Sequence, residues 1–444
     1  GLFLVDKEKK ELKSVHHDGQ ALFPLPARSI IEFKKDILWA ATDNGLMEYD
    51  IREGKSRFVY QTSGYEKLSD THLHTLYIDR SKGIWIGSYF GGVNHISRHK
   101  QNFVHYLPQH NGLNARIISV FAPADRSNLW IGTDDAGVFY WDREKNSFTP
   151  YTAFTRGQTQ THKNTHAILQ DGDQLFIGTY MGGLDVFNLK TGEKKNYSHS
   201  SSPNSLYSPS VYSLYKDSEN ELWVGRTGGL NRYLPSTQSF ERIYELGHIS
   251  INSIFEDKHR NLWVCTYNDG VFCLDRAEEE WIHYGYHPGD SASLPCRTLN
   301  TASIDDEGNI WFGSDGDGLV KYDSEARRFT KINLPEHIRV VNKVLSAGGV
   351  VWITTSNGMY CYNETDNSLK SYDKNDGLQG NQFMPNSGIQ LPDGTLCVGG
   401  TNGFNEFNPA NMRKISPKIE LILSDFELFN KPVRISSPDS PLTE

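Results

Sequence analysis

The sequence repeats one short pattern nine times along its 444 residues, and this repeat constrains the fold more than any other feature. Each copy centres on one residue, usually tryptophan, in a segment such as "LWIG", and successive centres lie 40 to 48 residues apart. A period of this length indicates a propeller or a solenoid. The nine anchors are Trp39, Trp85, Trp130, Phe176, Trp223, Trp263, Trp311, Trp352 and Cys397.

Each copy also contains four short segments with the pattern of β-strands. In one copy an apolar stretch, Val211–Asp217, is followed by a polar turn, a "LWVG" segment, a "GLNRY" segment and a final segment, Ser239–Tyr244. Turn residues separate these segments, and no helical periodicity is present. Four antiparallel strands per repeat describe one blade of a β-propeller, so we predict an all-β fold. The anchor aromatic residues would then be packing wedges between neighbouring blades.

Composition agrees with this fold and excludes some functions. Aromatic residues make up 12% of the chain and there are 39 glycines, which suits many strands joined by tight turns. The net charge of −9 predicts no basic surface and no contact with nucleic acid. No apolar run is long enough for a membrane span. The five cysteines lack a CxxC motif and indicate buried thiols: Cys265, Cys273, Cys296, Cys361 and Cys397.

Two further classes of repeated residue have local structural explanations. The glycine after the anchor, for example Gly132, is expected where space near the axis is limited, and the glycine that starts the third strand, for example Gly137, fits a turn with positive φ. An acidic residue ends the first strand of several copies, and its carboxylate is expected to tie the following turn. These acidic residues are Asp79, Asp217, Asp257 and Asp305.

The repeat, with its core D-x-x-G-x-[LI]-W-[IV]-G-T, resembles the two-component regulator propeller repeat. The segments Ser201–Leu214 and His287–Asn300 resemble the linkers of that family, and Asn375–Gly388 and Gly399–Pro409 resemble its last blade. The segment Ser416–Val433 resembles the start of the triple-tyrosine β-sandwich domain that follows the propellers. The resemblance covers essentially the whole chain.

The resemblance implies a division into three parts. The family usually carries two seven-bladed propellers, the sandwich, a membrane span, a histidine kinase, a receiver and a DNA-binding module. Seven anchors counted back from Cys397 reach Trp130. We therefore expect the final blades of a preceding propeller at 1–98, a seven-bladed propeller at 99–409, and a linker with the first sandwich strands at 410–444. One larger ring closed by all nine anchors is the alternative. The opening "GLFLVD" resembles a strand already under way, which suggests an excised fragment.

The copies differ most between the second and third strands, and in a blade these tips lie on the same face as the links between blades. Constant positions would build the blade, and the variable tips would form a ligand-binding face. Aromatic tip residues are expected to stack on sugar rings, and charged ones to hydrogen-bond hydroxyls or an acidic sugar. The alternative is that they fill the face or contact another protomer. The candidate residues are Tyr89, Phe90, Asp134, Asp135, Tyr180, Arg226, Tyr267, Asp269, Asp315 and Asp317.

No metal, cofactor or catalytic residue is predicted. Asp315 and Asp317 form an oxygen-rich loop, but two carboxylates fall short of the ligand number that Ca²⁺ requires. His72 and His74 share one strand face, as some zinc ligands do, but the sequence shows no third ligand. The aspartate before each turn faintly resembles the Asp-box of sialidases, but its repetition favours a structural role.

Three functions are compatible with these patterns. The resemblance implies the periplasmic sensor region of an inner-membrane hybrid two-component regulator. Such a region would bind a glycan-derived oligosaccharide, form a homodimer and control polysaccharide-utilisation genes through a kinase. The membrane tether and the kinase would lie beyond the C-terminal segment, so the fragment itself would not be an enzyme. The second candidate is a propeller-fold polysaccharide lyase or glycosidase, and the third is a dimerisation scaffold that binds no ligand.

Overall fold

The structure, a computed structural model, describes residues 3–6, 9–14, 16–17, 20–21, 26–59, 68–80, 82–96, 103–109, 111–125, 127–290, 293–412, 427–428 and 431–432. The described residues form two compact units. One lies within Gly1–Thr62, Glu66–His99 and Arg413–Glu444, and the other lies within Lys100–Met412. Apart from strands, the described residues contain only three short 3-10 helices: η1 (Tyr151–Ala153), η2 (Lys374–Asp376) and η3 (Pro409–Asn411). The predicted all-β fold is therefore confirmed.

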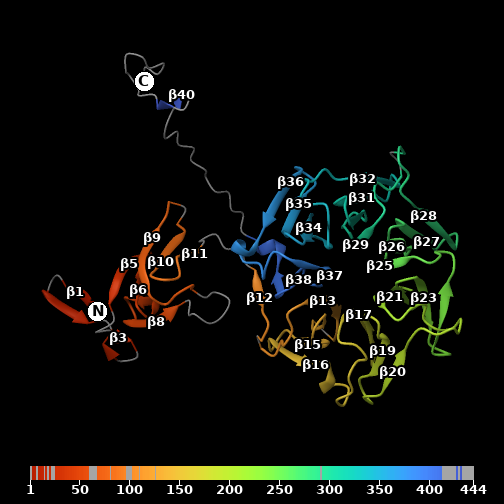
Figure 1. The fold of residues 1–444 in the computed structure, drawn as a ribbon, viewed down its shortest axis with the longest axis horizontal. Coiled ribbons are helices and arrows are strands. Elements are labelled where there is room, and N and C mark those ends of the chain that lie inside the picture. Colours follow the sequence, from red (N-terminus) through yellow and green to blue (C-terminus); the bar gives the residue numbers. More distant parts are fainter. Residues whose placement is uncertain are drawn as a thin grey trace. The chain divides into compact units, whose positions relative to one another are not determined.

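The larger unit is a ring of seven four-stranded antiparallel sheets, which we call blades 1 to 7 in chain order (Figure 1). Blades 1 to 3 contain β13 (Ile118–Pro123), β14 (Leu129–Thr133), β15 (Val138–Asp142) and β16 (Ser147–Pro150); β17 (Thr165–Asp171), β18 (Gln174–Thr179), β19 (Gly183–Asn188) and β20 (Lys194–Tyr197); and β21 (Val211–Lys216), β22 (Leu222–Arg226), β23 (Gly229–Leu234) and β24 (Ser239–Ile243). Blades 4 to 6 contain β25 (Ser250–Glu256), β26 (Leu262–Tyr267), β27 (Val271–Asp275) and β28 (Glu280–Tyr284); β29 (Leu299–Ile304), β30 (Ile310–Ser314), β31 (Leu319–Asp323) and β32 (Arg328–Lys331); and β33 (Lys343–Ala347), β34 (Val350–Thr355), β35 (Gly358–Asn363) and β36 (Ser368–Tyr372).

Blade 7 closes the ring with strands from both ends of the unit. It contains β37 (Phe383–Gln390), β38 (Leu396–Gly400), β39 (Gly403–Phe407) and, as its outer strand, β12 (Val104–Tyr106). The rings of Tyr106 and Phe404 stack at 4.5 Å, and Ser387 Oγ donates to the Ile118 carbonyl of blade 1 at 2.7 Å. The first strand of every blade contacts the first strands of both neighbours, including β37 with β13, so these strands line the axis.

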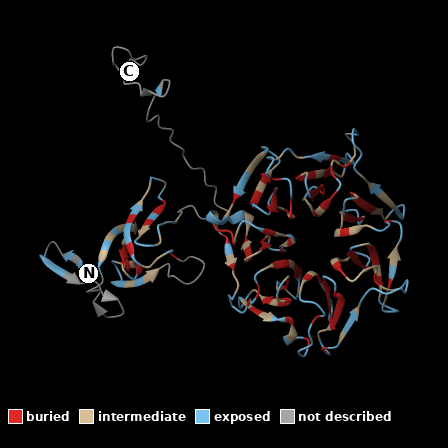
Figure 2. Cartoon of the chain, in the orientation of Figure 1, coloured by how far each residue is buried: buried red, intermediate tan, exposed pale blue. Residues whose placement is uncertain are grey.

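The core of the ring is divided among the seams between blades. Seven clusters of buried side chains correspond to the seven seams, and Figure 2 shows the buried residues along the inner strands of each blade. Each anchor belongs to the seam with the following blade. Trp130 packs with Leu175 of blade 2, and Trp311 packs with Val341 of blade 6. Burial of such large aromatic surfaces is the main stabilising contribution to a propeller.

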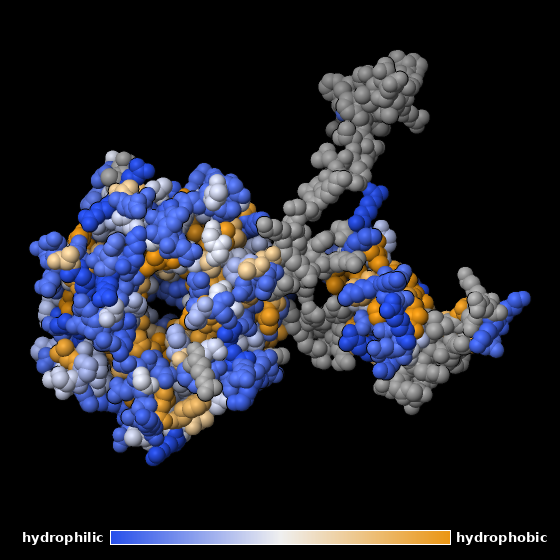
Figure 3. Space-filling model, turned by 180° about the vertical axis from the view of Figure 1, so that it is seen from behind, coloured by the Kyte–Doolittle hydropathy of each residue, from blue (hydrophilic) through white to orange (hydrophobic). Residues whose placement is uncertain are grey.

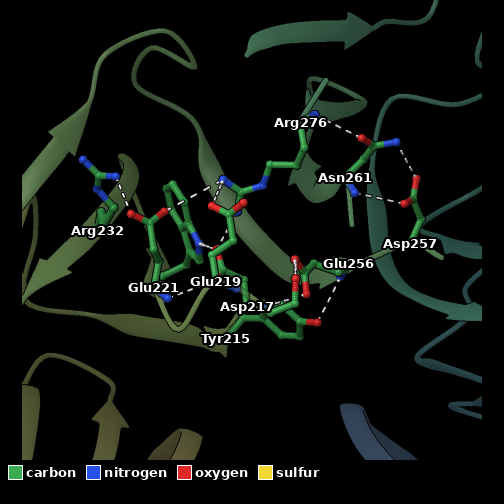
Figure 4. A network of polar contacts seen from close by, with 11 residues as sticks. Tyr215, Asp217, Glu219, Glu221, Arg232, Glu256, Asp257, Asn261 and Arg276 are labelled. Atoms are coloured by element: carbon green, nitrogen blue, oxygen red, sulfur yellow. Dashed lines mark hydrogen bonds and ion pairs between the residues drawn. The ribbon is translucent and has the colours of Figure 1, made fainter. Parts of the chain in front are cut away.

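The predicted role of the acidic residues is confirmed, and the structure adds a second one. Asp217 Oδ1 accepts the backbone N–H groups of Glu219 and Glu221, so it ties the turn. Its other oxygen accepts the indole N–H of Trp223 at 2.7 Å and pairs with Arg276 of blade 4 at 2.6 Å (Figure 4). Asp79, Asp257 and Asp305 bind their turns and tryptophans in the same way. One carboxylate thus fixes the turn, orients the anchor and, in blade 3, bridges the seam.

The N-terminal unit contains a four-stranded and a three-stranded sheet of the same repeat. These are β5 (Ala27–Lys34), β6 (Ile37–Thr42), β7 (Gly45–Asp50) and β8 (Lys55–Val59), and then β9 (Leu73–Ile78), β10 (Ile84–Ser88) and β11 (Val93–Ile96). Short hairpins of β1 (Phe3–Asp6) with β2 (Glu11–Ser14) and of β3 (His16–His17) with β4 (Gln20–Ala21) precede them. Trp39 of the first sheet is buried against the second sheet.

Trp85 departs from the predicted packing role. Its side chain is 42% exposed, and Tyr77 and Val93 on the same face of the β9–β11 sheet are exposed as well. Within the described part of this unit, no sheet covers that face, and Trp85 packs only within its own sheet, against the ring of His95 at 4.4 Å. Hydrophobic side chains at the surface of this unit are visible in Figure 3.

Three further expectations concern the number of blades, the C-terminal segment and the cysteines. Seven sheets, rather than nine, close the ring. The expected start of a β-sandwich at Ser416–Val433 lies almost entirely outside the described residues, of which only β40 (Glu427–Leu428) and β41 (Lys431–Pro432) pair as a short hairpin. All five cysteines are free, and only Cys361 is not fully buried.

Candidate ligand-binding site

The variable tips of the blades occupy one structurally defined place in the repeat. A threonine or serine usually ends the second strand and donates its hydroxyl to the glycine carbonyl that starts the third strand, as from Thr133 to Gly137 at 2.8 Å. We call the next residue the tip position. Its backbone N–H bonds to the segment before the first strand, from Asp134 to Ile117 at 3.1 Å and from Tyr180 to Asn164 at 3.0 Å. Tip residues are therefore held beside the start of the innermost strand.

A second repeated place lies in the first strand itself. Most first strands carry one extra residue in a β-bulge, which we call the bulge position. Ser119 at this position donates to the Thr165 carbonyl of the next blade at 2.5 Å, and Asn252 donates to the Leu299 carbonyl at 3.0 Å. Asn300, Asn342 and Ser387 make the corresponding bonds at their seams. Five of the seven seams are thus clamped by a hydroxyl or amide donor close to the axis.

The other two seams carry aromatic residues at the bulge position. These are His166 of blade 2 and Tyr212 of blade 3, whose rings meet edge to face at 4.9 Å. Tyr180, at the tip of blade 2, lies 6.5 Å from His166 and 6.3 Å from His162, measured between ring centroids. Burial and the nearby His162 lower the pKa of His166 to about 4, so its imidazole is neutral at pH 7. An aromatic cluster thus replaces the clamp on one side of the ring.

Several side-chain oxygens near this cluster are buried without a hydrogen-bond partner, and two of them lie beside the tip positions. These two are Asp134 Oδ1, at the tip of blade 1, and Asn164 Oδ1, just before the first strand of blade 2. Burial, with a smaller contribution from Asp135, raises the pKa of Asp134 to about 6. Buried polar atoms usually have partners, so an unsatisfied acceptor beside a tip position marks a place where a ligand hydroxyl would supply the missing hydrogen bond.

The N-terminal unit contains a cavity at the equivalent place. A pocket of about 290 Å³ is lined by Arg28, Asp43, His72, Leu73, His74, Tyr89 and Phe90. Arg28 and Asp43 form a two-pronged ion pair at 3.0 and 3.4 Å, and this hydrogen bonding holds the pKa of Asp43 below its usual range. The rings of Tyr89 and Phe90 meet edge to face at 4.6 Å, and both are largely exposed.

The structure therefore groups some of the predicted residues and separates others. Tyr89 and Phe90 share one pocket, and Asp134 and Tyr180 occupy tips of consecutive blades. Tyr267 and Asp315 occupy tips further around the ring, Asp135 hydrogen-bonds the Arg116 backbone, and Asp269 lies 3.6 Å from His283. Asp317 pairs with Lys331 at 2.7 Å. No group of three or more metal-binding side chains occurs among the described residues.

Arg226 is a correction, because its guanidinium is buried and not available on the tip face. Arg226 occupies the position where most other blades end the second strand with threonine or serine, and it is 0% exposed. The side chain turns inward, donates to Asn231 Oδ1 and the Ser208 carbonyl, and lies over the Tyr207 ring at 5.2 Å. Burial and the nearby Arg242 lower its pKa to about 9.

The residues that sequence reasoning missed are those of the first strands. His166 and Tyr212 follow the first buried residue of their strands, where several other copies carry serine or asparagine, and His74, which the sequence raised only as a zinc ligand, has the same position. Aligning that position across the repeats would have marked these copies as different. The bulge that turns the side chain toward the seam is visible only in the strand pairing.

No described helix has the length and apolar character needed to cross a membrane.

The fold and the repeat define a class, and comparison with known proteins agrees with it. Residues 245–268 match the family model for the two component regulator propeller. The extracellular domain of the putative hybrid two component system BT3049 from B. thetaiotaomicron superposes with a TM-score of 0.71 at 22% identity, covering 98% of this chain and 59% of that one. The recognition from the repeat is thus confirmed: the chain carries a two-component regulator propeller repeat and has the fold of such an extracellular domain.

Two further relatives limit the conclusions about function that can be drawn from this likeness. "Histidine kinase P4" of Formosa agariphila is 24% identical over 372 residues, covering 80% of this chain and 27% of that protein. The chain therefore spans less than two thirds of either signalling relative. A virginiamycin B lyase from Staphylococcus aureus superposes with a TM-score of 0.52 at 12% identity, covering 69% of this chain and 99% of that one. This last match reflects the propeller fold alone.

Proposed function

We propose that this chain is the periplasmic ligand-binding part of a membrane-bound hybrid two-component sensor, and that its ligand is an oligosaccharide derived from a glycan. The repeat and the likeness to extracellular domains of hybrid two-component systems support the class of protein. The ligand class rests on the chemistry of the tip face, because fold alone does not specify function.

The observation that carries the ligand class is the pairing of exposed aromatic rings with unsatisfied acceptors. Tyr180 and Tyr89 are 46% and 67% exposed and lie beside the start of a first strand. Asp134 Oδ1 and Asn164 Oδ1 are acceptors without a donor. A sugar offers both complements, because its C–H face packs on an aromatic ring while its hydroxyls donate hydrogen bonds.

In this proposal the ligand acts by changing the arrangement of two chains in a homodimer. A ligand shifts such an equilibrium only by the difference between its affinities for the two arrangements. The change would pass through a C-terminal membrane tether to a kinase and so control polysaccharide-utilisation genes. This step requires residues outside the chain described here.

Titration calorimetry with a panel of oligosaccharides from neutral and acidic polysaccharides tests the proposal. We expect saturable heat with one chemically related group of oligosaccharides, and no new reducing ends or unsaturated products after prolonged incubation. Saturable binding without turnover separates a sensor from a lyase or glycosidase. Absence of heat across the whole panel would contradict the proposal, and product formation would favour the enzyme.

A further inference from the structure

The pocket of the N-terminal unit can be described by repeat positions instead of by residue names. Asp43 is the tip residue of the first sheet, since it follows Thr42, whose hydroxyl donates to the Gly45 carbonyl. His74 is the bulge residue of the next sheet, because Thr75 and Leu73 pair with successive residues of β10. Tyr89 is the tip residue of that same sheet, and a large apolar residue, Phe90, follows it. The pocket thus forms where two consecutive sheets meet.

The ring carries the same residue types at the same four positions, once. Asp134 is the tip residue of blade 1, His166 is the bulge residue of blade 2, and Tyr180 is the tip residue of blade 2. Met181, again large, apolar and exposed, follows Tyr180. The first strands of the two sheets are in contact in both units, β5 with β9 and β13 with β17. The aspartate, histidine and tyrosine therefore have equivalent placements in the two units.

None of the other six blades of the ring carries this combination. At the bulge position these blades have serine, asparagine or tyrosine, as at Ser119, Asn252 and Tyr212. Blade 4 is the nearest comparison, because Tyr267 occupies its tip. There the bulge residue is Asn252, which is engaged in the clamp, and the tip of the preceding blade is Thr227. Nine copies of one repeat thus contain two copies of one constellation, in separate units.

We propose that these two places, which we call the twin sites, each bind one neutral sugar ring of the oligosaccharide. This inference rests on the proposed function and adds the location and the chemical class of the ligand. The tyrosine supplies a stacking face, the neighbouring phenylalanine or methionine supplies apolar contact, and the aspartate accepts from a pair of hydroxyls. The pocket volume of about 290 Å³ in the N-terminal unit suits a single sugar ring and not a longer segment.

The charges at the twin sites favour a neutral sugar over an acidic one. In the N-terminal unit, Arg28 is already paired with Asp43, so no cation is left over for a ligand carboxylate. In the ring, Asp134 and Asp135 lie next to each other. Ser119 occupies the bulge position that Arg28 occupies in the N-terminal unit, and it carries no charge. A uronic acid or a sulfated sugar would meet uncompensated negative charge there. Neutral hydroxyls instead satisfy the free oxygen of Asp134.

Saturation-transfer NMR on the whole chain tests the twin sites with defined probes. These probes are the methyl glycosides of glucose, galactose, mannose and xylose, with glucuronic and galacturonic acid as the acidic arm. The variants are Tyr89→Ala, Tyr180→Ala and the double variant, and the matched control is Tyr267→Ala. The three tyrosines are 67%, 46% and 59% exposed, so their removal should leave the fold intact, which circular dichroism checks.

We expect saturation transfer to at least one neutral glycoside and none to the uronic acids. Each single variant should retain one of two sites, the double variant should weaken binding at least tenfold, and Tyr267→Ala should bind like the wild type. Three results would overturn the twin sites: full binding by the double variant, equal loss in Tyr267→Ala, or preference for the acids. If the double variant also keeps its calorimetric response to oligosaccharides, the sensor proposal stands while this inference fails. A wild-type chain that binds no saccharide would overturn both.

Discussion

The two units contain the same repeat, yet the same anchor is buried in one and exposed in the other. Trp223 in blade 3 and Trp85 in the N-terminal unit each donate the indole N–H to an aspartate six residues earlier, at 2.7 and 2.8 Å. Trp223 is 3% exposed because blade 4 covers it, whereas Trp85 is 42% exposed. The local motif therefore forms within one sheet, while the burial that makes it stabilising requires the next sheet.

The largest expected effect on the free energy of unfolding comes from removing the two indoles, which tests this difference directly. Trp223→Ala should lower the free energy of unfolding of the ring by about 3–5 kcal/mol, because it leaves a large cavity in a packed seam. Trp85→Ala should cost about 1 kcal/mol or less, since much of its surface already contacts solvent. Urea unfolding followed by circular dichroism, with the two units fitted as separate transitions, measures both. Equal losses would contradict the comparison.

The aspartates that hold these indoles should differ in the same direction. Asp217→Ala removes the acceptor for Trp223 and leaves the mostly buried Arg276 without its closest partner, so we expect a loss of about 3 kcal/mol. Asp79→Ala should cost about 1 kcal/mol, the usual value for lost hydrogen bonds at a partly exposed site. Asp217→Asn is the control, because it keeps the shape and an acceptor but removes the charge. Unfolding midpoints in which Asp79→Ala matches Asp217→Ala would show that the seam adds nothing.

The glycines after the anchors allow a smaller test of the same seam. A Cβ at Gly225 would lie 2.6 Å from the Ile251 side chain of blade 4, which is fully buried and cannot move aside. Gly225→Ala should therefore cost about 1–3 kcal/mol through overpacking. A Cβ at Gly87 meets Thr75 at the same distance, but Thr75 is exposed and can shift, so Gly87→Ala should cost less than about 1 kcal/mol. Melting temperatures of the two variants give the ranking.

The smallest net effect is the change of stability with pH, because the bulge histidine of the ring and Asp134 act in opposite directions. The pKa of His166 is lowered to about 4, so the folded ring resists a proton that the unfolded chain accepts near pH 6.5. Stability should accordingly fall as the pH drops from about 6.5 toward 4, and this group alone should account for a loss of about 2 kcal/mol at pH 5. His166→Gln should flatten this part of the stability profile.

Asp134 acts in the opposite sense and provides the control for that profile. Its pKa is raised to about 6, so the folded state favours the protonated form, and stability should rise as the pH drops through 6 toward 4. Asp134→Asn should therefore steepen the loss on acidification that His166→Gln flattens. A profile that neither variant changes would show that these two groups do not titrate as their surroundings indicate.

The repeat predicted the sheets, because the information for each sheet lies within 40 to 48 consecutive residues. The spacing of Asp217 and Trp223, the glycine turns and the alternation of the strands are local features, and they are found in the structure where the sequence placed them. The variable tips also predicted where Tyr89, Asp134 and Tyr180 lie in their blades. Local hydrogen bonding and turn chemistry are sufficient for such predictions.

What the sequence could not show depends on contacts between blades. The sequence places Arg226 among variable tip residues and so predicts an exposed side chain. Its guanidinium is instead buried, because it donates hydrogen bonds to Asn231 Oδ1 and to the Ser208 carbonyl. His166 and Tyr212 were overlooked because the bulge that turns them toward the seam is a property of strand pairing. Ring closure through β12 and the exposure of Trp85 also depend on which sheet lies next to which. The sequence determined the blade because a blade is local, and tertiary structure decided the site because the site lies between blades.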